Sequence, residues 1–243
     1  MTHRPCAYLV SILLAALFSC STVQHNQRAA APGAPRPDAW YEPEIRAFEA
    51  ADKVAPQPPG QVLFVGSSSI RLWTSLATDM SPMPVLNRGF GGSKTGEVLA
   101  VFDRIVLPYR PSIIVYYCGD NDLGNNNTDS QAAAEGFLAF DRRARAEWPG
   151  IRVFYIPIKA SVARWNNWPA MAKANQIVRD YSARTPGATY LDTVTPTLMP
   201  EGTPDPSIFR EDGLHLNAKG YAAWTTVIRP ALLEAWKAVQ AER

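Results

Sequence analysis

Two short stretches of this sequence are apolar at nearly every position, and they constrain the fold more than any other feature. Residues 113–117 read Ile-Ile-Val-Tyr-Tyr, and residues 153–156 read Val-Phe-Tyr-Ile. A strand with one face in water alternates apolar and polar residues, whereas a strand covered on both faces is apolar throughout. Each stretch is therefore predicted to be a strand in a sheet with helices on both faces.

Strand-like and helix-like segments alternate along the chain. Strand patterns occupy 61–65, 84–88, 112–118, 151–158 and 188–192, and helical patterns occupy 68–77, 95–107, 129–148, 168–185 and 217–240. A further helix is expected from about Pro43, which suits a first turn, to the proline-rich stretch that begins at Pro56. Such alternation favours parallel strands joined by right-handed crossovers. We predict an α/β fold, a three-layer α/β/α sandwich with a five-stranded parallel sheet.

The N-terminal segment differs in character from this predicted domain. Arg4 precedes an apolar run at 7–18 that is too short for an ordinary membrane span and ends at Ser19-Cys20. The run resembles a bacterial lipoprotein signal, with lipid attached at Cys20, and an ordinary secretory leader is the alternative. Polar residues, alanine and proline at 21–39 favour a flexible tether.

We therefore expect a signal peptide at 1–19, a lipidated Cys20 with its tether at 20–39, and a folded domain at 40–243. The mature protein would be an exported lipoprotein of the cell envelope, held at a membrane by its lipid anchor. That membrane would be the outer one if the source is Gram-negative.

Composition narrows the partners and the chemistry. A formal net charge of +2 gives no electrostatic reason to expect a nucleic-acid partner. Of three cysteines, Cys6 would leave with the leader and Cys20 would carry lipid, so Cys118 is expected to be a lone buried thiol. With so few histidines and free cysteines, we expect no zinc or other metal site.

Ligands of a parallel sheet bind at the carboxyl ends of its strands, so the loops that follow the strands hold the candidate residues. The first strand ends in Gly66-Ser67-Ser68-Ser69, where a serine is either a nucleophile or a helix cap. The second leads to Gly89-Phe90-Gly91-Gly92, whose glycines allow close backbone approach but lack the spacing of a phosphate-binding loop. The third leads to Gly119-Asp120-Asn121-Asp122, which is ordinary turn chemistry with an amide donor at Asn121.

His215 is the only histidine inside the predicted domain, because His3 and His25 precede it. Any base catalysis by histidine in this domain must therefore use His215. Asp212 stands three residues before it, where a carboxylate can fix the tautomer of the imidazole. The alternative is a plain surface loop before the last helix, with Asn217 as its cap.

In this order, the four loops resemble the motif blocks of the SGNH hydrolase superfamily, the GDSL esterases and lipases, over about residues 40–240. The resemblance implies a flavodoxin-like fold, no cofactor, and an SGNH hydrolase domain at 40–243. It also implies a role for each site residue. The nucleophile would be Ser68, the base His215 and its orienting carboxylate Asp212, with an oxyanion hole of the Ser68 and Gly92 N–H groups and the Asn121 amide. The family's usual aspartate before the nucleophile is replaced here by Ser67, as in what looks like a bacterial branch.

The implied activity is that of a serine esterase or acylhydrolase acting on short-chain carboxylic esters. O-acetyl groups on carbohydrate and lipid esters are both candidate substrates, and Arg164 and Trp165 are candidate substrate contacts in the loop after the fourth strand. The alternative is a noncatalytic, lipid-anchored carbohydrate-binding protein on the same scaffold, which only Ser67 favours.

Overall fold

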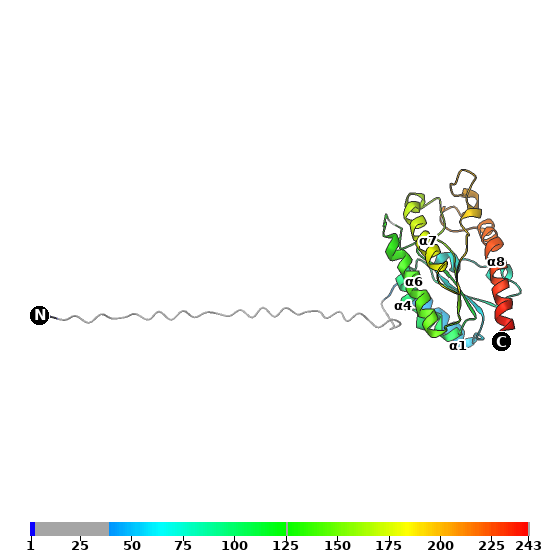
Figure 1. The fold of residues 1–243 in the computed structure, drawn as a ribbon, viewed down its shortest axis with the longest axis horizontal. Helices are drawn as coiled ribbons and strands as arrows, with labels where there is room; N and C mark the ends of the chain where they lie inside the picture. The colour runs from blue at the N-terminus through cyan, green and yellow to red at the C-terminus, as the bar shows by residue number, and fades with distance from the viewer. Residues whose placement is uncertain (3–38, 125, 243) are drawn as a thin grey trace. The chain divides into compact units, whose positions relative to one another are not determined.

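The computed structural model describes residues 1–2, 39–124 and 126–242 of the chain (Figure 1). The chain divides into two units, residues 1–30 and 31–243, and the helices and strands described below belong to the second. Apart from residues 1–2 and 39, the predicted signal peptide, Cys20 and the predicted tether lie outside the described residues. Within the described ranges, no helix is both long and apolar enough to cross a membrane.

Five strands pair into one sheet, in the order β2-β1-β3-β4-β5, and every pairing is parallel. They are β1 (Val62–Gly66), β2 (Val85–Gly89), β3 (Ile113–Tyr117), β4 (Arg152–Tyr155) and β5 (Ala188–Tyr190). The predicted five-stranded parallel sheet is thus confirmed. Because β2 and β3 flank β1 on opposite sides, the strand order reverses at β1, and ligand sites form at such reversals. Gly66 pairs with both Gly89 and Tyr117, so these three strands end level with one another.

The helices fill the segments between the strands. They are α1 (Glu42–Val54), α2 (Ser68–Arg71), α3 (Leu76–Asp79), α4 (Thr95–Ala100), α5 (Phe102–Ile105), α6 (Ser130–Glu147), α7 (Trp168–Ser182) and α8 (Ala218–Ala241). Short 3-10 turns are η1 (Leu107–Tyr109), η2 (Trp165–Asn167), η3 (Thr195–Thr197) and η4 (Pro206–Ile208). Pro43 lies in the first turn of α1, as predicted.

Most predicted elements differ from the observed ones by one to three residues at an end, and three of them differ most. The helix expected at 68–77 is divided into α2 and α3, and the break lets the Trp73 ring pack in the core against Tyr221 and Trp224. The helix expected at 95–107 is divided at Val101, a buried β-branched residue, into α4 and α5. The strand expected at 151–158 stops at Tyr155, since Pro157 has no N–H to donate to a neighbouring strand.

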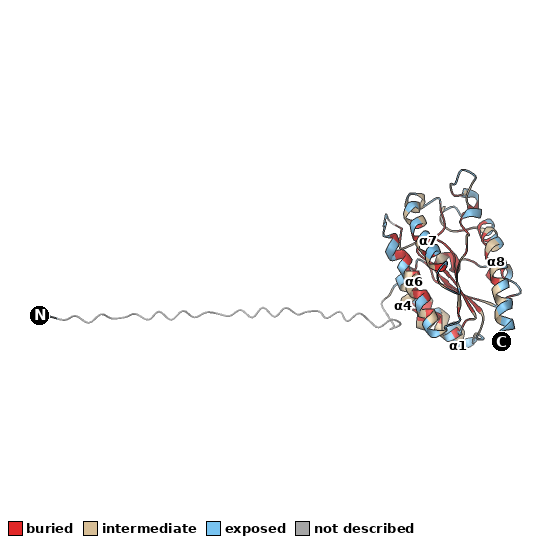
Figure 2. Cartoon of the chain, in the orientation of Figure 1, coloured by how far each residue is buried: buried red, intermediate tan, exposed pale blue. Residues whose placement is uncertain are grey.

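Different helices cover the two faces of the sheet (Figure 1). Along β3, Ile114 and Tyr116 face a core built with α1 and α4 to α7. Their neighbours Val115 and Tyr117 face a second core built with α2, α3 and α8. Figure 2 shows the buried residues gathered in the sheet and on the sides of the helices that face it. This arrangement confirms the predicted three-layer α/β/α sandwich and explains why the central strands are apolar on both faces.

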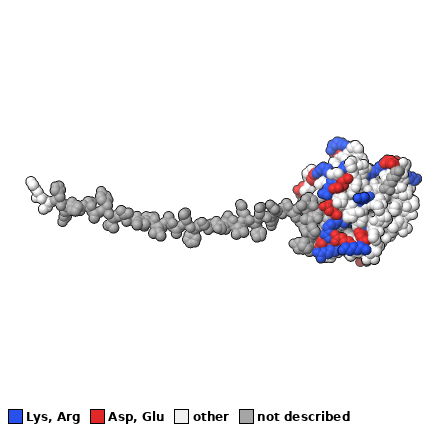
Figure 3. All heavy atoms as spheres, turned by 90° about the horizontal axis from the view of Figure 1, so that it is seen from below, with Lys and Arg blue, Asp and Glu red and all other residues white. Residues whose placement is uncertain are grey.

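Charged side chains of both signs are mixed on the surface. Figure 3 shows Lys and Arg beside Asp and Glu on the face that it presents. Several exposed charges are paired, as where Arg142 binds Glu135. Among the described residues on this face neither sign dominates, so it lacks the one-signed field that would attract a charged polymer.

Candidate active site

The turn from β1 into α2 positions the three serines. Gly66 has φ +137°, and a Cβ there would lie 1.7 Å from the carbonyl oxygen of Tyr117, so only glycine fits where β1 passes β3. The Ser67 N–H donates to that same carbonyl at 3.0 Å. Ser67 and Ser69 are each only 1% exposed, whereas Ser68 is half-buried at the start of α2. Of the three, Ser68 therefore offers the hydroxyl that a substrate can reach.

The loop before α8 is held by its own hydrogen bonds. Oδ1 of Asp212 accepts from the N–H groups of Leu214 and His215, both at 2.9 Å, and Oδ2 lies 2.6 Å from Nδ1 of His215. Asn217 caps α8 by accepting from the first N–H groups of the helix, as the sequence suggested. Burial acts to raise the pKa of Asp212, but the hydrogen bonds from His215 and Leu214 outweigh it and lower that pKa to about 2. Asp212 is therefore a carboxylate at neutral pH.

Ser68 and His215 meet although 147 positions of sequence separate them. Nε2 of His215 lies 2.9 Å from Oγ of Ser68. With Nδ1–H donated to the Asp212 carboxylate, neutral imidazole has Nε2 free to accept the serine proton. The three side chains therefore have the connectivity of a nucleophile, a base and the group that orients the base.

The two remaining predicted loops also come together. Gly92 lies in the loop after β2 with φ +69°, and the indole of Trp40 packs against it, 3.2 Å from where a Cβ would stand. Asn121, after β3, donates from Nδ2 to the Ser93 carbonyl oxygen at 3.1 Å. Arg164 donates to Oδ1 of Asn121, also at 3.1 Å, which assigns the orientation of the amide. Asn121 therefore presents its amide donors toward the glycine loop.

Beneath Asn121 lies a buried ionic cluster that the sequence reasoning missed. The carboxylate of Asp120 binds Nζ of Lys159 at 2.5 Å and the guanidinium of Arg164, and it accepts from the hydroxyl of Tyr117 at 3.1 Å. Burial alone would raise the pKa of Asp120, but Lys159 and Arg164 overcome it and lower the value to about 2. The signal in the sequence was Lys159, which directly follows an apolar strand. Asp120 lies in a segment that reads as ordinary turn chemistry.

Arg164 and Trp165, the two predicted substrate contacts, occupy different surroundings. Besides its side-chain bonds, Arg164 donates to the backbone oxygen of Asp120 at 2.7 Å, so its guanidinium is engaged by the loop after β3. Trp165 is half-buried and stacks against Trp168, with ring centroids 6.1 Å apart. A contact of either residue with substrate stays a prediction.

Other potentially reactive groups in the described residues lack an arrangement for catalysis. Cys118 is buried and free, and burial raises the pKa of its thiol well above the usual range. In the part of the chain that the structure describes, no cluster of three or more His, Cys, Asp or Glu side chains is placed to hold a metal ion.

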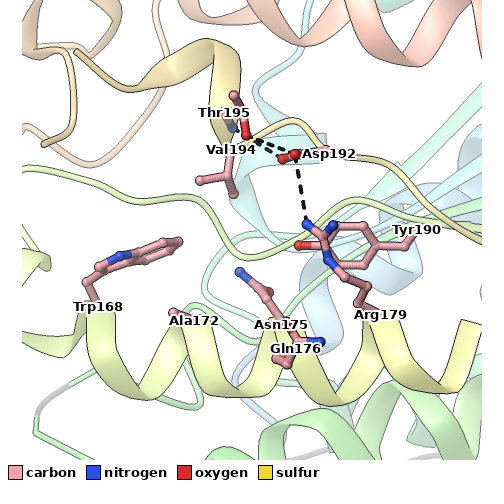
Figure 4. Close-up of a pocket in the computed structure, with 9 residues that line it drawn as sticks. All are labelled: Trp168, Ala172, Asn175, Gln176, Arg179, Tyr190, Asp192, Val194 and Thr195. Atoms are coloured by element: carbon pink, nitrogen blue, oxygen red, sulfur yellow. Dashed lines mark hydrogen bonds and ion pairs between the residues drawn. The ribbon is translucent and has the colours of Figure 1, made fainter. Parts of the chain in front are cut away.

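A separate pocket of about 170 Å³ opens between α7 and the chain that leaves β5 (Figure 4). Three of its polar side chains pair with one another, since Thr195 donates its hydroxyl to Asp192 at 2.8 Å and Arg179 lies 3.8 Å from the same carboxylate. Arg179 also covers the ring of Tyr190. The residues that line this pocket include none of the predicted site residues, and we place the candidate site instead at the loops after β1, β2 and β3 and the loop before α8.

Several solved structures share this fold, and some of them are described as acylhydrolases, lipases or esterases. One from Bacteroides fragilis, described as an acylhydrolase, has a TM-score of 0.69 at 19% identity over 82% of this chain and 99% of its own. A GDSL-like lipase from Bacteroides thetaiotaomicron has a TM-score of 0.64 at 17% identity over 79% of this chain and 98% of its own. An acetyl esterase has a TM-score of 0.58 at 16% identity over 74% of this chain and 99% of its own. No curated protein matches the chain in sequence.

The model of the GDSL-like Lipase/Acylhydrolase family matches residues 64–223. The chain belongs to this family and is a hydrolase of ester bonds. The matched region runs from β1 into α8, and it includes all four loops on which the sequence resemblance was based.

Proposed function

We propose that this hydrolase cleaves short-chain carboxylic esters by a Ser68–His215–Asp212 triad. His215 takes the proton of the Ser68 hydroxyl as Oγ attacks the ester carbonyl, and the tetrahedral intermediate collapses as His215 returns that proton to the departing alcohol oxygen. Water then attacks the acyl-Ser68 ester with the same base, which releases the acid and restores the serine. The observation that carries the proposal is the 2.9 Å contact between Ser68 Oγ and His215 Nε2.

The negative oxygen of the intermediate needs donors that are in place before the reaction. We assign this role to the backbone N–H groups of Ser68 and Gly92 and to the Asn121 amide. The Ser68 N–H suits it because the N–H at the start of a helix has no partner within that helix. These steps use only groups of this chain and water.

The acyl group is expected to be small, and acetyl is the simplest candidate. Support comes from the acetyl esterase that shares the fold. O-acetylated carbohydrate and lipid esters both carry such a bond, and fold alone does not choose between them.

Reaction with a fluorophosphonate tests the proposal directly. The probe phosphonylates an activated serine with loss of fluoride, so we expect one equivalent to bind and peptide mass spectrometry to locate it on Ser68. A protein inactivated by heat serves as the control. Absence of labelling in native protein would favour the noncatalytic carbohydrate-binding alternative, and labelling at Ser67 or Ser69 would refute the assignment of the nucleophile.

Replacing Asn121 with alanine tests the oxyanion hole. We expect kcat to fall by about 10²–10³-fold with little change in KM, because the lost amide stabilises charge that develops only in the transition state. The rate on p-nitrophenyl acetate measures both constants. Asn166, an exposed asparagine in η2, supplies a matched Asn→Ala control that should keep its activity. A fall confined to KM would contradict the assigned role.

We also propose that the enzyme works in the cell envelope as a lipoprotein anchored through Cys20. Support comes from the apolar run at 7–18 and the cysteine that follows it. Radiolabelled palmitate should enter the wild-type protein during expression in a bacterium and should not enter a Cys20→Ala variant.

A further inference from the structure

The chain between β5 and α8 forms one side of an apolar cavity near the candidate active site. Met199 and Thr203 close a small loop there, with the Met199 N–H donating to the Thr203 oxygen at 2.8 Å. This loop faces the segment after β4 across a cavity of about 280 Å³. The cavity is lined by Val162, Trp165, Met199, Thr203, Pro204 and Pro206.

One wall of this cavity contacts the loop that carries Asp212 and His215. Val162 lies 3.3 Å from where a Cβ of Gly213 would stand, and the Ala163 N–H donates to the Gly213 oxygen at 3.0 Å. Gly213 stands between Asp212 and His215 in the sequence. The segment 162–164 therefore borders the apolar cavity at one end and reaches Asn121 through Arg164 at the other.

The lining selects for an apolar ligand. Apart from the Thr203 hydroxyl and the indole N–H of Trp165, its side-chain groups are aliphatic, aromatic, thioether or proline groups. Val162 is 46% exposed, which leaves apolar surface open to a ligand beside the triad. Sugar hydroxyls placed there would lose water without enough partners, and burying unpaired polar groups is costly. An alkyl or aryl group would instead gain the free energy of apolar burial.

We propose that this cavity binds the apolar part of the alcohol arm of the ester, so that the preferred substrates are acetates or similar short acyl esters of apolar alcohols. The inference rests on the proposed function. His215 must hand its proton to the departing alcohol oxygen, so the alcohol arm lies on the histidine side of the ester. The cavity adjoins the loop that carries His215, while the acyl carbonyl oxygen turns toward Gly92 and Asn121.

Two isomeric esters separate the two arms. Hexyl acetate and ethyl hexanoate have the same formula and carry the same six-carbon chain, in the first on the alcohol side and in the second on the acyl side. Since apolar burial in a pocket changes kcat/KM by roughly 10-fold or more, we expect hexyl acetate to be preferred by at least about 10-fold. Titration of the released acid measures both rates in the same way.

Variants of the cavity lining test whether the preference for hexyl acetate arises in this cavity. Val162→Asp and Met199→Asp each place a carboxylate in a different wall of the cavity, and each should bring the ratio of the two kcat/KM values close to one. Because the readout is a ratio, a loss of activity common to both esters cancels. Val54→Asp makes the same change at an exposed valine in α1 and should keep the wild-type ratio.

A wild-type preference for ethyl hexanoate, or equal rates for the two esters, would overturn the proposal. So would a ratio that stays unchanged in either cavity variant. Failure of the proposed function gives a different result, since Ser68→Ala would then continue to hydrolyse both esters.

Discussion

Ser68→Ala is expected to lower kcat by about 10⁴-fold or more on any ester that the enzyme cleaves. Alanine removes the hydroxyl oxygen that lies 2.9 Å from Nε2 of His215, while the backbone N–H of residue 68 stays in place. The fold should persist, because the Ser68 side chain is half-buried and alanine is smaller. A residual rate above that of water is expected, since the oxyanion donors remain. Stopped assays with p-nitrophenyl acetate, at high enzyme concentration, measure it.

The two adjacent serines supply matched controls. Ser67→Ala and Ser69→Ala make the same chemical change on either side, at side chains that are almost fully buried. Each should keep kcat within a few-fold of wild type, because neither hydroxyl meets His215. A double variant, Ser68→Ala with His215→Ala, should be hardly slower than Ser68→Ala alone, since the members of a triad act as a unit. Additive losses in the double variant would contradict the triad.

Asp120→Asn is expected to lower the free energy of unfolding by about 3–5 kcal/mol at pH 7, the usual cost of breaking a buried ion pair from one side. The change leaves Lys159, whose side chain is 2% exposed, without its counter-charge. It also weakens the hold on Arg164, which orients Asn121, so kcat should fall as well. Urea unfolding followed by tryptophan fluorescence measures the stability.

The lowered pKa of Asp120 also predicts how its contribution to the free energy of unfolding changes with pH. The pKa of Asp120 is about 2 in the folded protein and about 3.9 in an unfolded chain, so its charge stabilises the fold above about pH 4. That contribution is lost as the pH falls from about 4 to 2, and Asp120→Asn should lack this part of the loss. Asp103→Asn, at a partly exposed ion pair with Arg143, should cost only about 0–1 kcal/mol. Equal costs for the two variants would show that the buried cluster contributes nothing special.

Arg164 was predicted from the sequence as a substrate contact, and that contact stays a prediction. Its position after an apolar strand placed it near a ligand-facing edge, and the structure puts it beside the candidate oxyanion donor. Its partners, Asp120 and Asn121, come from another strand's loop, and no local pattern in the sequence pairs them. The division of the helix expected at 68–77 has a similar origin, because the partners of Trp73 lie in α8.

By itself, the sequence determined the parallel sheet, the candidate loops and the histidine that any base catalysis must use. Apolar periodicity is a local property, and the rule that parallel strands present their carboxyl ends together turns it into a location for the site. Only the tertiary structure decided which of three serines faces His215, what balances the charge of Asp120, and that an apolar cavity adjoins the loop of His215. Those facts depend on contacts between segments that lie tens of residues or more apart in the chain, and such contacts form only when the chain has folded.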